Sequence, residues 1–196
     1  MKPYSESCVQ NRDAILSVIQ PLLAERKAVL EIGSGTGQHA VYFGAAMPHL
    51  NWHTSDQAVY HEGIRLWLEE AQLSNVHMPL TLDVQQANWP PLNVDAVFTA
   101  NTFHIMSEAM VVDCIAGVGK LLATGGLFIV YGPFNYQGEY TSASNASFDQ
   151  WLAMQNPESA IRDFEKVNRL AEEAGMALQE DYAMPANNRI LCWCKV

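Results

Sequence analysis

The stretch from Val29 to Gly37 constrains the fold of this chain more than any other feature of the sequence. It reads Val-Leu-Glu-Ile-Gly-Ser-Gly-Thr-Gly, so an apolar run is followed by three alternating glycines. Apolar residues from Ala28 predict a short buried strand, and residues from His39 predict the start of a helix. Glycine lets a backbone approach a ligand closely, and a helix N-terminus presents unpaired N–H groups. Together, strand, turn and helix predict a cradle for a nucleoside cofactor.

Two known motifs fit these glycines. From Gly35 the sequence Gly-Thr-Gly-Gln-His-Ala matches the dinucleotide pattern G-x-G-x-x-G/A. From Glu31 it reads E-x-G-x-G-x-G, through Gly33, Gly35 and Gly37, and this resembles motif I of class I S-adenosylmethionine-dependent methyltransferases. An acid beside the glycines suits the ammonium group of that cofactor. We therefore expect S-adenosylmethionine here, with a nicotinamide or flavin cofactor as the alternative.

Length and composition favour one globular domain over residues 1–196, because a chain with 49% apolar residues can bury a full core. No apolar run is long enough for a membrane span and the N-terminus lacks a secretory pattern, so we expect a cytoplasmic protein without a membrane partner. The four scattered cysteines predict reduced thiols rather than disulfides or a metal site. A net charge of −10, with only 11 Lys and Arg, argues against a nucleic-acid partner.

The periodicity of apolar residues predicts helices that alternate with strands. An N-terminal helix is expected at about 8–24, and Asn156 and Pro157 resemble the N-cap and first residue of a later helix. Gly125 and Gly175 are natural residues to follow the ends of two helices. The expected strands are 28–30, 50–55, 77–82, 95–100, 127–131, 177–183 and 189–196.

Strand–helix alternation of this kind predicts a parallel sheet that is covered on both faces. Only residues 185–188 separate the last two strands, and this link is too short for a parallel crossover. We therefore predict an antiparallel C-terminal strand in a mostly parallel seven-stranded sheet. That arrangement is typical of the Rossmann-like fold of class I methyltransferases, whereas nicotinamide domains usually end on a parallel strand.

Polar residues at the carboxyl ends of the strands are the candidates for ligand contacts, because open α/β sheets bind ligands there. Asp56 lies about 20 residues past the glycines, where an acid accepts hydrogen bonds from ribose hydroxyls. Asp83 and Val84 resemble the methyltransferase position where an acid takes the adenine amino group and an apolar neighbour packs on the ring. Helix capping by Asp56 and a solvated loop position for Asp83 are the alternatives.

The segment from Asn101 to His104 follows the fourth expected strand. Its sequence Asn-Thr-Phe-His resembles the strand-four motif of small-molecule methyltransferases, in which Asn101 would face the reactive methyl group. It is not the Asn/Asp-Pro-Pro-Tyr/Phe motif of amino-group methylases. His104 is a candidate base near neutral pH, and a structural donor is the alternative reading.

The segment 131–149 is polar yet aromatic and follows the fifth expected strand. We expect it to form a lid over the cofactor, with an ordinary surface loop as the alternative. Arg162 is expected to pair with a substrate carboxylate or, instead, to form an internal salt bridge to Asp163 or Asp149. The candidate substrate contacts are Arg12, Tyr131, Asn145, Asp149 and Arg162.

Several short motifs together resemble the uncharacterised methyltransferase-like twenty-six family over nearly the whole chain. The resemblance implies a class I methyltransferase fold and its cofactor, but no substrate. It rests on Asn11-Arg12, Asn101-Thr-Phe-His104, Tyr131-Gly-Pro-Phe134, Thr141-Ser-x-Ser-Asn145, Phe148-Asp149, Arg162-Asp163 and Met184-Pro-Ala-Asn-Asn188.

These observations predict methyl transfer to a small, polar or acidic metabolite. A nicotinamide oxidoreductase is the first alternative, although the Tyr-x-x-x-Lys pair of short-chain dehydrogenases does not occur in the sequence. A non-catalytic protein that binds S-adenosylmethionine is the second. The methyl acceptor and the oligomeric state do not follow from the sequence.

Overall fold

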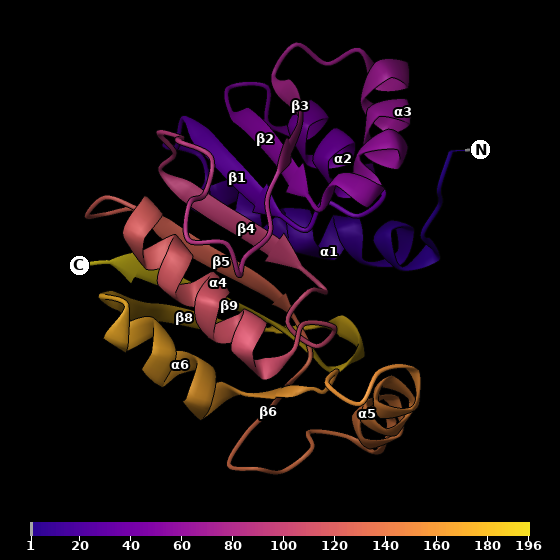
Figure 1. The fold of residues 1–196 in the computed structure, drawn as a ribbon, viewed down its shortest axis with the longest axis vertical. Coiled ribbons are helices and arrows are strands. Elements are labelled where there is room, and N and C mark those ends of the chain that lie inside the picture. Colours follow the sequence, from indigo (N-terminus) through magenta and orange to yellow (C-terminus); the bar gives the residue numbers. More distant parts are fainter. Residues whose placement is uncertain (1) are drawn as a thin grey trace. The chain divides into compact units, whose positions relative to one another are not determined.

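The computed structural model describes residues 2–196 and contains a seven-stranded, mostly parallel sheet with helices on both faces (Figure 1). The strand order is β3-β2-β1-β4-β5-β9-β8. Contacts within the chain group into two compact units, divided between Thr99 and Ala100. The strands of the large sheet are β1 (Ala28–Ile32), β2 (Asn51–Asp56), β3 (Val76–Thr81), β4 (Ala96–Ala100), β5 (Leu127–Gly132), β8 (Met176–Met184) and β9 (Asn188–Lys195).

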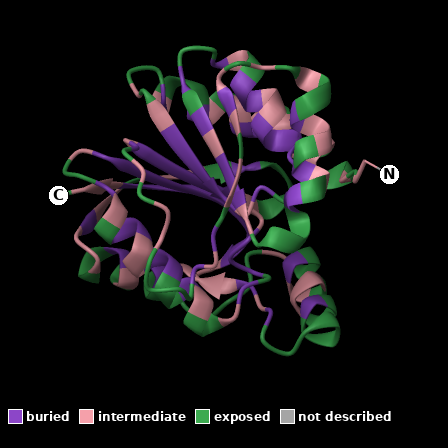
Figure 2. Cartoon of the chain, turned by 45° about the horizontal axis from the view of Figure 1, so that its top comes forward, coloured by how far each residue is buried: buried purple, intermediate pink, exposed green. Residues whose placement is uncertain are grey.

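The first unit is built on parallel pairing of β1 with β2 and β4, and of β2 with β3. Of these strands, β1 and β4 are short apolar runs that are largely buried, whereas β2 and β3 mix buried and exposed residues; Figure 2 shows buried residues along the strands of the sheet. A parallel sheet covered on both faces requires such runs. The first unit also contains α1 (Glu6–Leu22), α2 (Gln38–Ala46), η1 (Ala58–Tyr60) and α3 (His61–Ala71).

An aromatic cluster fills the core of the first unit behind the glycine-rich stretch. The rings of Phe43, Trp52 and Phe98 lie within 5.8 Å of one another, measured between centroids, and all three side chains are fully buried. They come from α2, β2 and β4, so the cluster fixes these elements together. Aromatic pairs in tilted and edge-to-face arrangements add to the free energy of area burial.

The second unit ends in the antiparallel hairpin that the sequence predicts. β9 pairs antiparallel with both β5 and β8, and the link between β8 and β9 includes η2 (Pro185–Asn187). Trp193 of β9 stacks on Phe128 of β5 at 5.7 Å between centroids. The other helices and strands of this unit are α4 (Glu108–Leu121), β6 (Phe134–Asn135), α5 (Ala143–Gln155), β7 (Arg162–Asp163) and α6 (Phe164–Glu173).

The structure confirms the predicted fold class and corrects several details. The first helix begins at Glu6 and ends at Leu22, slightly earlier than predicted. Asn156 is the C-cap of α5 rather than an N-cap, because α5 extends to Gln155, and the next helix, α6, begins only at Phe164. Gly175 follows the C-cap of α6 in a left-handed conformation, as predicted, whereas α4 already ends at Leu121 and Gly125 lies beyond its C-cap.

Two further findings bear on the sequence predictions. None of the helices in residues 2–196 combines the length and apolar character needed to cross a membrane. No disulfide bond joins any of the four cysteines, all of which lie in the described part of the chain. The single-domain boundary at 1–196 and the lid at 131–149 stay predictions.

Candidate functional site

The glycine turn, residues 33–37, joins β1 to α2 and needs its glycines for two different reasons. Gly33, Gly35 and Gly37 have φ of 71°, 57° and 88°, a region that disfavours residues with a Cβ. A Cβ on Gly37 would lie 3.2 Å from the backbone of Ile64 in α3, so this glycine permits close packing. A Cβ on Gly35 would meet no atom within 4 Å. Gly35 therefore presents its backbone to open space.

Asp56 lies against the glycine turn, as its position at the end of β2 predicts. One carboxylate oxygen accepts the N–H of Gly35 at 2.8 Å, and the other accepts the N–H of Gln57 at 2.7 Å. Burial raises the pKa of this carboxyl, while the two N–H donors act in the opposite direction. Asp56 thus holds the turn that is expected to bind the cofactor. Its predicted contact with ribose hydroxyls is not tested by these contacts.

Glu31 lies behind the glycine turn rather than on its open side. The side chain is 2% exposed, and one carboxylate oxygen accepts hydrogen bonds from Ser34 Oγ at 2.8 Å and Trp52 Nε1 at 3.2 Å. Burial raises the pKa of Glu31 to about 7, although both donors act to lower it. The sequence did not single out Ser34 or Trp52. Ser34 is one of the positions that the glycine motif E-x-G-x-G-x-G leaves unspecified.

Asp83 and Val84 follow β3 in a short turn. One carboxylate oxygen of Asp83 accepts the N–H of Gln85 at 3.0 Å, which is a local turn contact. Val84 is 5% exposed and belongs to the core. The predicted adenine contacts of this pair stay predictions.

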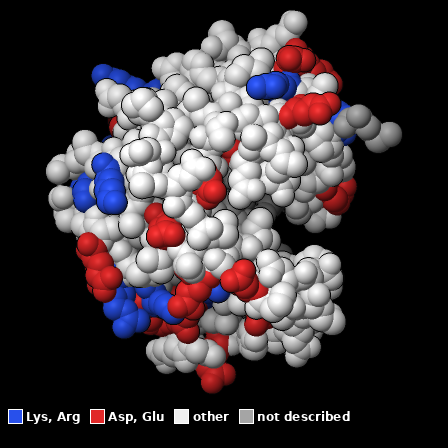
Figure 3. All heavy atoms as spheres, viewed as in Figure 1, with Lys and Arg blue, Asp and Glu red and all other residues white. Residues whose placement is uncertain are grey.

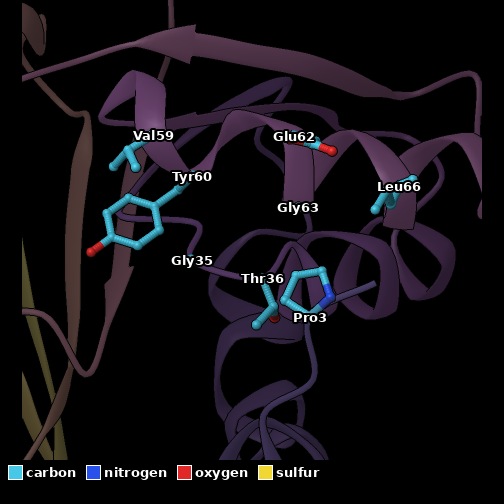
Figure 4. Close-up of a pocket in the computed structure, with 8 residues that line it drawn as sticks. All are labelled: Pro3, Gly35, Thr36, Val59, Tyr60, Glu62, Gly63 and Leu66. Carbon is cyan, nitrogen blue, oxygen red and sulfur yellow. The ribbon is translucent and has the colours of Figure 1, made fainter. Parts of the chain in front are cut away.

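A pocket of about 550 Å³ lies beside the glycine turn, entirely within the first unit (Figure 4). This volume lies in the range of small-molecule sites. Val59 and Tyr60 in its wall are 78% and 51% exposed, which leaves apolar surface without a protein partner. The pocket is lined by Pro3, Gly35, Thr36, Val59, Tyr60, Glu62, Gly63 and Leu66.

The N-terminal segment contributes Pro3 to this pocket, and no sequence motif predicts this. The N–H of Ser5 donates to Gln38 Oε1 at 2.6 Å, at the start of α2. Trp67 Nε1 donates to the carbonyl oxygen of Pro3 at 2.7 Å. A Cβ on Gly63 would lie 2.6 Å from the Pro3 ring, so this glycine gives the segment its place against α3. No apolar periodicity marks such a segment, because single polar contacts hold it.

Arg12 lies on α1 with its guanidinium 4.4 Å above the ring of Tyr42. Its Nε is buried and lacks a hydrogen-bond partner among residues 2–196. The neighbouring Asn11 is bonded to His39 Nε2 at 2.7 Å through its side-chain oxygen. Burial and the charge of Arg12 lower the pKa of His39 to about 4. The Asn-Arg pair therefore has structural contacts with α2, and the predicted substrate contact of Arg12 is not tested.

In the second unit, the residues after β4 form a tight, well-anchored loop. Asn101 has a φ of 58°, and its N–H donates to the carbonyl of Tyr131 at the end of β5, at 2.9 Å. His104 is 8% exposed and lies edge-on to Phe148 at 5.3 Å between centroids. Burial, aided by the charge of Arg162, lowers the pKa of His104 to about 4. The imidazole is therefore neutral at pH 7.

Arg162 holds the loop that carries His104. Its Nε donates to the carbonyl of Phe103 at 3.0 Å, and its Nη2 donates to the carbonyls of Met106 and Glu158. Three backbone acceptors thus occupy the guanidinium, and burial lowers its pKa. The salt bridges within residues 2–196 do not include Arg162, so the predicted internal pair with Asp163 or Asp149 is not formed there. Its bond with a substrate carboxylate stays a prediction.

The segment 131–149 is anchored by its own polar residues. Asp149 accepts the N–H of Ile161 at 2.6 Å and the hydroxyl of Tyr140 at 2.7 Å. Asn145 is 5% exposed and donates to Thr141 Oγ1 at 3.0 Å and to the carbonyl of Asn187 at 3.3 Å. The Thr-Ser-x-Ser-Asn and Met-Pro-Ala-Asn-Asn motifs therefore meet through Asn145 and Asn187.

On the face drawn in Figure 3, Lys and Arg occur in several separate places, and Asp and Glu lie among them. Within residues 2–196, salt bridges join Lys2 to Glu70, Lys166 to Glu108 and Arg189 to Asp181.

Fold and turn together define an α/β protein with the Rossmann-like methyltransferase architecture. The chain belongs to the family described as "Protein of unknown function (DUF938)", whose model matches residues 2–195. That description carries no activity, and the resemblance to the methyltransferase-like twenty-six family stays a prediction.

Several solved structures similar to this chain are described as methyltransferases or as members of an O-methyltransferase family. The mitomycin 7-O-methyltransferase MmcR is 17% identical with a TM-score of 0.85, and the match covers 97% of this chain and 54% of MmcR. The S-adenosylmethionine-dependent methyltransferase SibL is 21% identical with a TM-score of 0.82, and the match covers 96% of this chain and 55% of SibL. The structure described as PigF with SAH is 13% identical with a TM-score of 0.80, and the match covers 97% of this chain and 64% of PigF. The chain thus spans little more than half of the first two, and these likenesses establish its fold.

Proposed function

We propose that this protein binds S-adenosylmethionine at the glycine turn and transfers its methyl group to a small, polar or acidic metabolite. One observation carries the proposal: the turn has three left-handed glycines, and Asp56 holds it with Gly35 facing open space. The similar structures support it, since they include S-adenosylmethionine-dependent methyltransferases and one protein described with SAH.

The glycine turn would hold the methionine part of the cofactor. In the same proposal Asp56 accepts hydrogen bonds from the ribose hydroxyls, while Asp83 and Val84 contact the adenine. Asn101, whose left-handed backbone turns the chain just after β4, would face the methyl group. Glu31 would not touch the cofactor, because its carboxyl is buried behind the turn.

Methyl transfer from a sulfonium is an in-line displacement whose donor is already activated. The protein then has to align the acceptor atom with the methyl group and exclude water. In our proposal the segment 131–149 supplies this cover, with Phe148 as part of its aromatic surface. Tyr131, Asn145 and Asp149 fix the shape of the cover rather than reacting.

His104 would orient the acceptor through a hydrogen bond. Its imidazole is neutral at pH 7, so a ring nitrogen can accept a bond from an acceptor hydroxyl. With a pKa of about 4 it is a weak base, and complete proton removal before methyl transfer would be uphill. The arrangement therefore favours an acceptor that loses its proton late, as the new bond forms.

The small-molecule acceptor is supported by two kinds of observation. The similar structures include a mitomycin methyltransferase and an O-methyltransferase family protein in complex with apigenin. In addition, a chain of net charge −10 lacks the positive field that draws nucleic acid. A polar or acidic acceptor follows if Arg12 or Arg162 reaches it, because cations are few in this sequence.

Isothermal titration calorimetry with S-adenosylmethionine, S-adenosylhomocysteine and NAD⁺ tests the cofactor. We expect micromolar-range binding of the first two and none of the third. Transfer of a labelled methyl group from S-adenosylmethionine into a small-molecule metabolite extract then tests the reaction. Binding of NAD⁺ alone would favour the oxidoreductase, and binding without any transfer would favour a non-catalytic cofactor-binding protein.

A further inference from the structure

The carboxyl group of Glu31 links the glycine turn to β2 from behind. It accepts the hydroxyl of Ser34, inside the turn, at 2.8 Å, and the indole N–H of Trp52, on β2, at 3.2 Å. The Ser34 hydroxyl oxygen in turn accepts the N–H of Ser55 at 3.1 Å, and the Ser55 hydroxyl donates to the Glu31 carbonyl at 2.6 Å. The conformation of the turn is therefore tied to this buried carboxyl group.

No cation compensates the Glu31 carboxylate within residues 2–196. The salt bridges there do not include it, and the groups that act on its charge are the two hydrogen-bond donors and the carboxylate of Asp56 at the end of β2. Cys8, on α1, is the other titratable group in electrostatic contact with it. A buried carboxylate without a cation is costly, so its pKa of about 7 leaves both protonation states populated near neutral pH.

We propose that Glu31 is a positioning residue that senses cofactor charge and favours cationic S-adenosylmethionine over its neutral product at the glycine turn. This inference rests on the proposed function. S-adenosylmethionine carries a sulfonium and an ammonium against one carboxylate, whereas S-adenosylhomocysteine has lost the sulfonium charge. A cation on the open side of the turn stabilises the ionised carboxyl behind it, and the buried surroundings screen that attraction less than water would.

A proton linkage follows from this arrangement. Below about pH 7 the free protein holds a proton on Glu31, and binding of the cation releases that proton to solvent. The affinity for S-adenosylmethionine should therefore rise as the pH rises through neutrality. The affinity for S-adenosylhomocysteine should change little, so the preference for substrate over product grows with pH.

The test is calorimetry on the full chain with S-adenosylmethionine and S-adenosylhomocysteine at pH 6 and pH 8, in two buffers that differ in ionisation enthalpy. For the wild type we expect an affinity for S-adenosylmethionine about 3- to 10-fold higher at pH 8, with proton release at pH 6. S-adenosylhomocysteine should change by less than about twofold. Glu31→Gln keeps the size of the side chain and should remove the pH dependence while both ligands still bind.

Glu62→Gln is the matched control, because Glu62 lies at the same pocket but is exposed to solvent. It removes the same charge and should keep the wild-type pH dependence. Ser34→Ala withdraws one donor from the Glu31 carboxylate, so it should move the midpoint of the pH dependence upward. This second variant keeps the test informative if Glu31→Gln does not fold.

The outcomes separate the two proposals. If the wild type binds both ligands but Glu31→Gln keeps the full pH dependence, or Ser34→Ala leaves the midpoint unchanged, the role of Glu31 is refuted while the proposed function stands. If the wild type binds neither ligand at either pH, the proposed function fails and this inference fails with it. Loss of the pH dependence in Glu62→Gln as well would also refute a specific role for Glu31.

Discussion

The two units use their motif residues in opposite ways. In the first unit, buried groups behind the glycine turn hold a backbone whose other side is open at Gly35. In the second unit, Asn145, Asp149 and Arg162 each bond to groups of their own unit and hold loops in place. A distinctive motif therefore does not by itself mark a ligand contact, because a loop that must be held in one conformation needs specific polar residues as much as a ligand does.

The largest effect should come from a side chain on the open side of the turn. Gly35→Val should lower the affinity for S-adenosylhomocysteine by about 100-fold or more, roughly 2.8 kcal/mol, because a branched side chain would occupy the space of the cofactor. Gly125→Val is the matched control, since Gly125 also has a positive φ and an added Cβ would meet no atom within 4 Å. Undiminished binding in a folded Gly35→Val protein would show that the cofactor lies elsewhere.

The next effect tests whether Arg162 stabilises the second unit rather than binding a ligand. Arg162→Ala removes donors from three backbone carbonyls, so we expect it to lower the free energy of unfolding by roughly 2–4 kcal/mol in urea titrations while cofactor affinity stays unchanged. Arg169→Ala, on the exposed side of α6, should change the free energy of unfolding little. If Arg162→Ala is as stable as Arg169→Ala but has lost turnover, Arg162 binds the acceptor and the contrast between the units breaks down.

A smaller effect is expected at Asp56. Asp56→Ala should cost roughly 1.5–3 kcal/mol of affinity for S-adenosylhomocysteine, measured by calorimetry, because it removes the observed bond from the Gly35 N–H and the charge-assisted bonds proposed to the ribose. Asp56→Asn retains one acceptor oxygen and should lose less. Equal affinity in the wild type and both variants would limit Asp56 to bonding the local backbone at Gln57 and Gly35.

Much of the fold could be predicted because its signals are local. Continuous apolar runs predicted β1 and β4, and the short link before Asn188 predicted the antiparallel β9. Parallel pairing of β1 and β2 brings Asp56 to the turn, which a spacing of about 20 residues already indicated.

The parts that were missed depend on contacts distant in sequence. Helix α5 lacks apolar periodicity, and the buried Asn145 and Leu152 hold it in place, so the sequence indicated a loop there. The short β6 and β7 strands pair only because residues 134 and 162 meet in the fold. Trp52 behind Glu31 and Pro3 beside Gly63 gave no local signal at all, because each is placed by its partner.

The smallest effect concerns two histidines, one in each unit, that share a pKa of about 4. Their folded pKa lies below the unfolded value of about 6.5, so the folded protein holds fewer protons between these values. The stability from each neutral imidazole is therefore complete above pH 6.5 and is lost as the pH falls toward 4. His104→Gln and His39→Gln should each reduce the loss of unfolding free energy between pH 6.5 and pH 5 by roughly 1–2 kcal/mol.

Turnover then distinguishes the two histidines. His39 is bonded to Asn11 on α1, so His39→Gln should leave methyl transfer close to wild type once the protein is folded. His104→Gln should lower kcat about 10-fold or more if the imidazole orients the acceptor, with the cofactor affinity unchanged. Equal turnover in the two variants would show that His104 only holds its loop in place. Each candidate residue tested in the second unit would then have a structural role.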